Sequence, residues 1–212
     1  MLLVKIFTFS PVAENTYILY NDKGEAIIID PGCYSAEERS ALKSFLEKNE
    51  LKPVQLLNTH CHLDHVFSNK WVYENYGLEL FLHPNEEVVL SFAPQSGKMW
   101  GLPFENYDGP LHFLQQNDVV QLGSDELKVI LAPGHSPGSI CFYNEAQKFV
   151  IGGDVLFRES IGRTDLPGGN HATLLKSIRT QLFVLPDEVT VYPGHGTPTT
   201  IGFEKKNNPY LQ

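Results

Sequence analysis

Short runs of apolar residues divide the N-terminal part of the chain into predicted β-strands. Three runs cover residues 2–9, 16–21 and 25–30, and they are rich in β-branched and aromatic side chains. A turn at Asp30-Pro31-Gly32 ends the third run, because Pro and Gly favour reversal of the chain. The pattern predicts a sheet of closely spaced strands.

Helices are expected after these strands. Residues 35–50 carry a capping box formed by Ser35 and Glu38, followed by apolar residues at helical spacing. After a further strand-like run at 54–58, a second helix is expected over 69–76, which ends before a glycine. Strand and helix patterns alternate here, and this alternation indicates an α/β protein.

A third helix is expected to begin at Pro84, since proline is favoured at the first helical position. The stretch from Phe92 to Gly109 is rich in Gly and Pro, so we expect a long loop over one face. The second half restarts the strand pattern, with a helix capped by Asn170 before the last strand. Its predicted strands cover residues 118–122, 126–132, 140–144, 148–153 and 189–192.

Charge and cysteine content limit the partners and the compartment. The chain has 25 Asp and Glu residues and 16 Lys and Arg residues, which gives a net charge of −9. Neither a nucleic acid nor an anionic membrane is therefore expected as a partner. The N-terminus lacks the features of a signal peptide, and no apolar run approaches the roughly 20 residues of a membrane span. Three scattered cysteines give no disulfide framework, so we expect a cytoplasmic protein. We expect one domain over residues 1–212, as a monomer or small homo-oligomer.

The sequence His60-x-His62-x-Asp64-His65 concentrates ligand chemistry directly after the strand predicted at 54–58. Loops at one edge of a rigid sheet commonly bring distant residues together. Imidazole and carboxylate together form a ligand set that suits zinc, iron or manganese. Each further candidate follows a predicted strand in the same way, and these are His135, Asp154 and His195.

The spacing predicts two adjacent metal sites. In an extended segment His60 and His62 project to the same side and can bind one ion. The turn into the next helix would carry Asp64 and His65 toward a second ion. His135 would complete the first site, His195 the second, and Asp154 would bridge both, because a carboxylate has two oxygens. The expected ligands of two divalent metal ions, zinc first with iron or manganese as alternatives, are His60, His62, Asp64, His65, His135, Asp154 and His195.

These segments, in this order and over nearly the whole chain, resemble the motifs of the metallo-β-lactamase superfamily. They are His60-x-His62-x-Asp64-His65, Pro133-Gly134-His135-Ser136-Pro137-Gly138, Gly153-Asp154 and Pro193-Gly194-His195-Gly196. The resemblance implies an α/β fold, an αββα four-layer sandwich with two facing mixed sheets, helices outside and metals at one edge. The runs at 154–169 and 202–211 look most like the short bacterial glyoxalase II-like hydrolases.

A two-metal site of this kind can generate hydroxide at neutral pH, which would attack an electrophilic carbonyl. Asp64 would orient this nucleophile, as the catalytic residue. A thioester suits the site best, because a thiol with a pKa near 8.5 leaves without a strong acid. The resemblance implies a small-molecule substrate, S-lactoylglutathione or a related 2-hydroxyacyl thioester. Larger glyoxalase II enzymes bind glutathione through a further C-terminal helical segment. This chain ends 17 residues after His195, so we expect that contact to be missing or replaced.

Other reactions stay open. Persulfide dioxygenases have a similar histidine motif and use one iron, at positions that match His60, His135 and Asp154. A lactone or β-lactam hydrolase would use the same nucleophile. A nuclease fits poorly with the acidic charge. A non-enzymatic binding protein would be expected to have lost some of these ligands.

Neighbouring residues have two possible roles each. Asp30 either holds a ligand imidazole in place or only shapes its turn. Cys61 should point away from the adjacent histidines and into packing, although a redox or ligand role is the alternative. Arg163 and Asp165 pair with each other or bind a substrate carboxylate. The remaining histidines, His83, His112 and His171, are expected to be structural.

Overall fold

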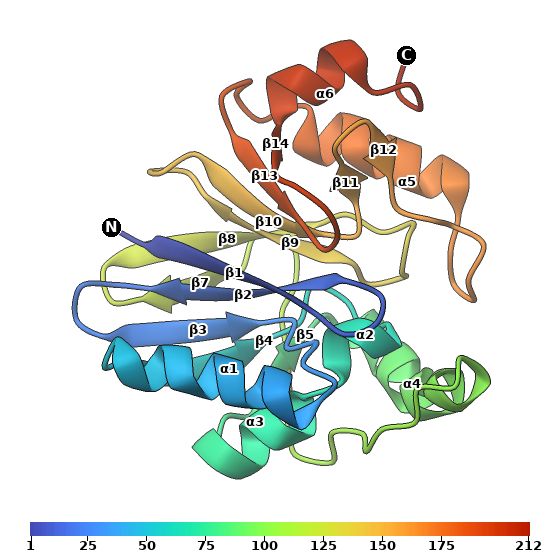
Figure 1. Ribbon diagram of the computed structural model, residues 1–212. Helices are drawn as coiled ribbons and strands as arrows, with labels where there is room; N and C mark the ends of the chain where they lie inside the picture. Colours follow the sequence, from blue (N-terminus) through green and yellow to red (C-terminus); the bar gives the residue numbers. More distant parts are fainter.

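A computed structural model describes residues 1–212 and contains two six-stranded β-sheets face to face, with helices on both outer faces (Figure 1). The αββα sandwich implied by the sequence motifs is confirmed. The layers follow from the alternation of strand and helix patterns along the chain, since each sheet must cover both of its apolar faces.

The first sheet has the order β1-β2-β3-β4-β5-β6. Its first three strands pair antiparallel, while β3 to β6 pair parallel through helical crossovers, as parallel neighbours require. The strands are β1 (Leu3–Phe9), β2 (Glu14–Tyr20), β3 (Glu25–Ile29), β4 (Lys52–Leu57), β5 (Leu80–Leu82) and β6 (Leu111–Phe113). The last two are too short to have been recognised from the sequence.

The second sheet has the order β14-β13-β10-β9-β8-β7, and only its β10–β13 pair is parallel. A small hairpin of β11 (Leu156–Phe157) and β12 (Ser160–Ile161) follows β10. The strands of the sheet are β7 (Val119–Leu122), β8 (Asp125–Leu131), β9 (Ile140–Asn144), β10 (Phe149–Gly153), β13 (Thr190–Pro193) and β14 (Thr199–Thr200).

Helices cover the two outer faces, and none of them is long and apolar enough to cross a lipid bilayer. On the side of the first sheet lie α1 (Ala36–Lys48), α2 (Leu63–Val66), α3 (Asn69–Tyr76), the 3₁₀ turn η1 (Pro84–Glu86) and α4 (Glu87–Met99). On the side of the second lie α5 (His171–Ser177), the π-helical turn η2 (Ile178–Leu182) and α6 (Ile201–Asn207). The capping box of Ser35 and Glu38 begins α1 as predicted.

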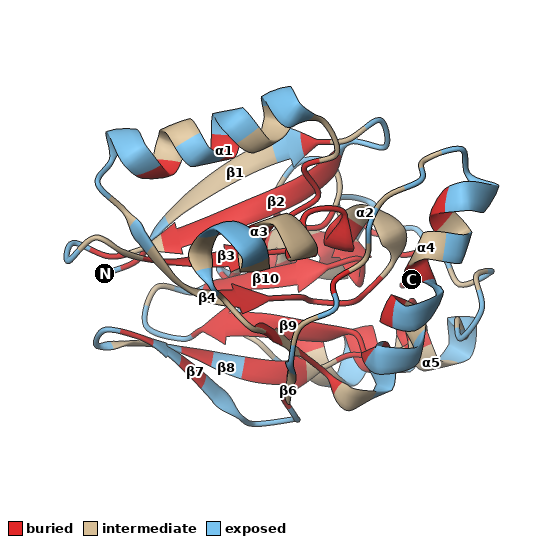
Figure 2. Cartoon of the chain, turned by 90° about the horizontal axis from the view of Figure 1, so that it is seen from below, coloured by how far each residue is buried: buried red, intermediate tan, exposed pale blue.

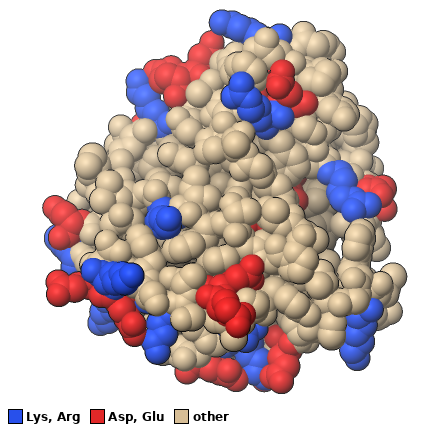
Figure 3. Space-filling model, in the orientation of Figure 1, with Lys and Arg blue, Asp and Glu red and all other residues tan.

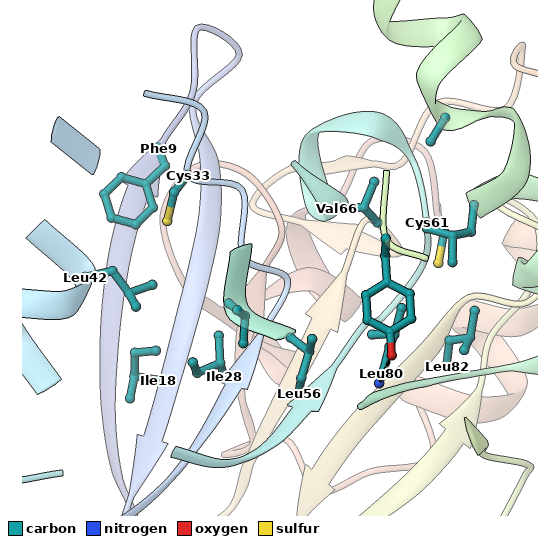
Figure 4. Packing of buried hydrophobic residues seen from close by; sticks show 14 of the residues in the cluster. Phe9, Ile18, Ile28, Cys33, Leu42, Leu56, Cys61, Val66, Leu80 and Leu82 are labelled. Atoms are coloured by element: carbon teal, nitrogen blue, oxygen red, sulfur yellow. Dashed lines mark hydrogen bonds between the residues drawn. The ribbon is translucent and has the colours of Figure 1, made fainter. Parts of the chain in front are cut away.

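Three separate apolar clusters lie between the four layers. Along β3, Ile28 faces the helices of the first sheet, while Ile27 and Ile29 face the second sheet. All three are fully buried, because both faces of this strand are covered (Figure 2). The outer cluster of the first sheet joins Ile28 to Leu42 of α1 (Figure 4). A third cluster lies between the second sheet and α5, η2 and α6.

The loop expected from Phe92 to Gly109 is wrong over its first part, because α4 continues to Met99 with Pro94 inside it. Proline has no N–H for the carbonyl one turn earlier, which is that of Leu90. Here the side-chain amide of Asn106 donates to the Leu90 carbonyl at 2.8 Å. Tertiary packing thus supplies the missing hydrogen bond, and the apolar face of α4 stays buried on the first sheet.

Candidate metal centre

The predicted ligands lie at one edge of the sandwich, where strands from both sheets end. The His60–His65 segment follows β4, His135 follows β8, Asp154 follows β10 and His195 follows β13. Strands β8, β10 and β13 run in the same direction, because β8 and β10 are both antiparallel to β9 and β13 is parallel to β10. Their carboxyl ends therefore meet, and the fold brings all seven side chains together.

Backbone hydrogen bonds join the two sheets at this edge. The Ile140 N–H donates to the Thr59 carbonyl at 2.9 Å, next to the histidine motif. The Asn15 N–H donates to the Gly194 carbonyl at 2.7 Å, next to His195. These bonds hold loops of one sheet against strands of the other and so fix the distance between the two halves of the site.

Three imidazoles form the first group of possible ligands. The Nε2 atom of His135 lies 2.8 Å from Nδ1 of His62 and 3.1 Å from Nε2 of His60. The three ring nitrogens therefore face one point. His60 and His135 are buried, and His62 is partly exposed toward the cavity at this edge. A cation bound between these nitrogens would be coordinated by all three.

Asp64, His65 and His195 form the second group. The Nε2 atom of His195 lies 3.1 Å from Oδ2 of Asp64, and Nε2 of His65 lies 3.7 Å from the same oxygen. Asp154 lies between the two groups. Its Oδ2 is 3.4 Å from Nε2 of His135, and its Oδ1 is 3.5 Å from Nε2 of His65. One carboxylate thus reaches both groups.

The outer ring nitrogens of four histidines donate to oxygen acceptors. These bonds turn the Nε2 atom of each ring into the site, where the Nε2 of a neutral ring can bind a metal ion. The Nδ1 donors and their acceptors are His60 to Thr59 Oγ1 at 3.1 Å, His65 to Asp30 Oδ2 at 3.1 Å, His135 to the Arg163 carbonyl at 2.7 Å and His195 to the Ala13 carbonyl at 3.1 Å.

Unpartnered polar atoms show that the site fits a bound cation. The Nε2 atom of His65 and Oδ1 of Asp154 are buried, face each other and make no hydrogen bond. Buried polar atoms without a partner are rare and costly, unless an ion satisfies them. A cation between this nitrogen and this oxygen would satisfy both, and the N/O donor set is one that binds zinc, iron and manganese.

The charge distribution differs between the two groups. Burial and neighbouring imidazoles lower the pKa of His60, and they lower that of His62 to about 3. These rings are neutral at neutral pH and ready to bind a metal ion. Burial alone would lower the pKa of His65 too, but Asp64 and Asp154 raise it well above its ordinary value. The second group therefore lies in a negative field that favours positive charge.

The model of the metallo-beta-lactamase superfamily matches residues 10–195. The chain belongs to this superfamily.

Similar superfamily members cover almost the full length of the chain. Hydroxyacylglutathione hydrolase GloC of Haemophilus influenzae is 35% identical over 212 residues, which are 98% of this chain and 97% of the relative. The crystal structure of the BLEG-1 B3 metallo-beta-lactamase has a TM-score of 0.91 at 37% identity and covers 99% of this chain and 100% of its own. TTHA1623 in a di-iron-bound form has a TM-score of 0.88 at 35% identity and covers 98% and 100%. Superfamily membership makes this chain a metal-binding hydrolase by descent.

Asp30 holds the imidazole of the candidate ligand His65 and does not merely shape its turn. Its φ of 51° is in the left-handed region, and its Oδ2 accepts a hydrogen bond from Nδ1 of His65. Besides His65, Oδ2 accepts from the Thr59 hydroxyl, which accepts in turn from His60, and Oδ1 accepts from Asn58 and from the Thr59 N–H. The hypothesis of an outer partner was right, and the residue serves both groups.

Two further carboxylates are buried beside the site and belong to none of the sequence motifs. Glu86 accepts from the Cys61 N–H at 2.7 Å, and its other oxygen accepts from the Ser136 hydroxyl and the Gly138 N–H at 2.6 and 2.7 Å. It therefore ties the loop of His60 and His62 to the loop of His135. Glu14 lies 3.8 Å from His65 and is completely buried. Neither lies in a ligand motif, so only the tertiary structure reveals them.

Cys61 and Arg163 take the structural roles favoured from the sequence. The Cys61 thiol packs in the outer apolar cluster (Figure 4), and burial raises its pKa well above its ordinary value, which suits neither a metal ligand nor a redox thiol. The Arg163 guanidinium donates two hydrogen bonds of 2.7 Å to the Asp165 carboxylate. Away from the ligands, His83 caps η1, and His112 pairs with Glu79.

Proposed function

We propose that this protein is a metal-dependent thioester hydrolase of the glyoxalase II type. Two divalent metal ions would bind at the site, zinc first with iron or manganese as alternatives. His60, His62 and His135 would hold one ion, and Asp64, His65 and His195 the other. Asp154 would contact both. The observation that carries the proposal is the position of Asp154, with its two oxygens 3.4 and 3.5 Å from one imidazole of each group.

When bound, the metal pair would supply a hydroxide at neutral pH and polarise a carbonyl oxygen. Asp64 lines the cavity, and its Oδ2 lies 3.1 Å from Nε2 of His195, so its carboxylate is held where it can orient the attacking oxygen. Hydrolysis adds this oxygen to the acyl carbon, breaks the C–S bond and leaves a carboxylic acid and a thiol. The outer hydrogen bonds of the histidines keep the ligand set rigid during this step.

The walls of the cavity favour a good leaving group. The cavity has a volume of about 380 Å³, and no Lys or Tyr lines it. An amine or alkoxide must be protonated as it leaves, whereas a thiol with its pKa near 8.5 leaves without a strong acid. This supports a thioester over an amide. S-lactoylglutathione is the first substrate to try, given the name and full-length similarity of the Haemophilus relative.

Metal content and anaerobic assay test the proposal. The purified, metal-reconstituted protein should contain about two metal ions per chain and should hydrolyse S-lactoylglutathione or another acyl-glutathione without oxygen. Chelation should abolish the activity and metal should restore it. Failure of the metal-loaded protein to hydrolyse any acyl-glutathione would refute the proposal.

A mononuclear-iron dioxygenase is a second candidate, because one two-histidine, one-carboxylate set is also complete. His135 lies 3.1 Å from His60 and 3.4 Å from Asp154. Such a set suits non-haem iron. Replacement of His195 by Ala separates the two functions. It should remove about half of the metal from a dinuclear hydrolase, and should leave the metal content of a one-iron dioxygenase unchanged.

We propose a cytoplasmic location for this enzyme. The three cysteines are free and buried, which is compatible with a reducing compartment. Acidic and basic side chains are interspersed on the face shown in Figure 3, without a large positive area that would attract nucleic acid. Its partner would be a small-molecule substrate, and its state a monomer or small homo-oligomer.

A further inference from the structure

A second cavity adjoins the metal centre. It has a volume of about 360 Å³, at the lower end of the range for small-molecule pockets. Four residues line both this cavity and the cavity over the ligands, so the two share a wall. The shared residues are His62, Leu63, Ser96 and Leu166.

The second cavity is walled mainly by apolar groups. Val89, Phe92 and Ala93 of α4 form one side, and Leu166 and Pro167 form the other. Ala93 is buried, whereas Phe92 is exposed. Because α4 continues past Pro94 and does not become a loop, these three side chains are held on one rigid face. The cavity would bury an apolar group that fits its length.

Positive charge is scarce in both cavities. No Lys lines either of them, and Arg163 is the only Arg. The guanidinium of Arg163 is already paired with Asp165 through two hydrogen bonds. A substrate carboxylate would therefore find no unpaired Lys or Arg side chain in these walls, whereas an apolar substituent would find a wall of apolar side chains.

We propose that the second cavity selects thioesters that carry a compact apolar substituent, which lies between α4 and the segment of Leu166 and Pro167 while the thioester carbonyl lies over the metal ligands. This inference rests on the proposed thioester hydrolysis and names the recognised part of the substrate. The apolar substituent can belong to the acyl group or to the thiol of the substrate.

Two substrate series distinguish these sources. The first keeps glutathione as the thiol and lengthens the acyl group from acetyl to hexanoyl. The second keeps the acetyl group and lengthens the thiol from ethanethiol to hexanethiol. Each buried methylene should raise kcat/KM about fourfold until the cavity is filled. A rise in the first series assigns the cavity to the acyl group, and a rise in the second to the thiol. Flat values in both series would overturn the inference and leave the hydrolase proposal standing.

A binding measurement separates the inference from the reaction. S-alkyl glutathiones from ethyl to hexyl have no carbonyl to hydrolyse, so calorimetry with the metal-loaded protein reports only on recognition. Affinity should rise with alkyl length if the acyl side occupies the cavity. If the protein hydrolyses no thioester and yet these ligands bind with rising affinity, the proposed function fails and the apolar cavity remains.

A variant that fills the cavity provides the structural test. Ala93→Phe adds a ring to the cavity wall. In the series that shows the rise, it should reduce the ratio of kcat/KM between the longest and the shortest substrate at least tenfold. Gln95→Phe adds the same ring to an exposed position of α4 that lines neither cavity, and it should keep the ratio. An unchanged ratio in Ala93→Phe would contradict the proposal. If that variant does not fold, the substrate series of the unmodified protein decides.

Discussion

Nδ1 of His65 donates a hydrogen bond of 3.1 Å to Oδ2 of Asp30, and both residues are completely or almost completely buried. The bond turns Nε2 of His65 toward Asp154, where this nitrogen has no partner within the protein. The same carboxylate reaches His60 through the Thr59 hydroxyl. A turn residue outside the ligand motifs thus orients one imidazole in each group.

Asp30→Asn should weaken metal binding about 10- to 100-fold, since losses of this size follow removal of an outer hydrogen-bond partner. Asn tolerates the left-handed backbone at this position, so the effect should come from the lost carboxylate charge and acceptor. Competition with a chelator measures the affinity. Asp187→Asn, at an exposed ion pair with Lys205, is the control. Equal metal affinities of the two variants would contradict the role of Asp30.

Glu86→Gln should loosen the two loops that carry His60, His62 and His135. Whichever way the new amide turns, its NH₂ group faces a donor, either the Cys61 N–H or the Gly138 N–H. An unsatisfied buried donor costs about 1–3 kcal/mol of unfolding free energy. Urea denaturation measures this cost, and kcat should fall as well. Glu87→Gln, at the exposed neighbouring position, should change neither quantity. Stability equal to that of the control would contradict the role of Glu86 in holding the two loops together.

Gly194→Ala should displace the carboxylate that lies between the two groups. A Cβ at this position would lie 2.1 Å from Oδ1 of Asp154 and 2.8 Å from Cε1 of His65, both far inside van der Waals contact. We expect loss of metal from the second group and at least a tenfold fall in activity, measured by elemental analysis and assay. Gly77→Ala, which meets no atom within 4 Å, should lose about 1 kcal/mol of stability through its positive φ but keep its metal. Full metal content in Gly194→Ala would rule out the predicted clash.

Removal of metal should lower the thermal stability of the protein. The ligand atoms are preorganised in the fold, so an ion binds the native state and not the unfolded chain. An ion at a hundred times its dissociation constant adds about 2.7 kcal/mol to the free energy of unfolding. Scanning calorimetry with and without chelator measures the shift in Tm, and metal should reverse it. An identical Tm in both states would argue against bound ions at this site.

The metal-free protein should lose stability in acid through His62. Its pKa is lowered from the ordinary value near 6.5 to about 3. Between pH 6.5 and pH 3 the unfolded chain therefore binds more protons than the native state. The contribution of neutral His62 is therefore present above pH 6.5 and is lost as pH falls toward 3. The His62→Gln variant has no titratable side chain at this position, so it should lose less stability over the same pH range. Urea denaturation at pH 7 and pH 4 compares the two proteins, and parallel losses would contradict the prediction.

The longer strands, the first helix and the set of candidate ligands could be read from the sequence, because local patterns of residues indicate them. Apolar runs indicated β3 and β10, and the capping box of Ser35 and Glu38 indicated α1. The histidine motif indicated metal chemistry, since few other functions need so many imidazoles at that spacing. Family motifs along the chain then implied the four layers, and the fold and the superfamily match confirm them.

Other features depend on residues that meet only in three dimensions. Pro94 remains inside α4 because Asn106 bonds the Leu90 carbonyl, and no local pattern contains that contact. Glu86 reaches two loops that lie 25 and 50 residues away in the sequence. A buried carboxylate looks like any surface glutamate in the sequence, because its burial depends on the layers that close over it. The sequence by itself determined which side chains are available for metal binding, and the tertiary structure decided which acceptors orient them and which apolar cavity lies beside them.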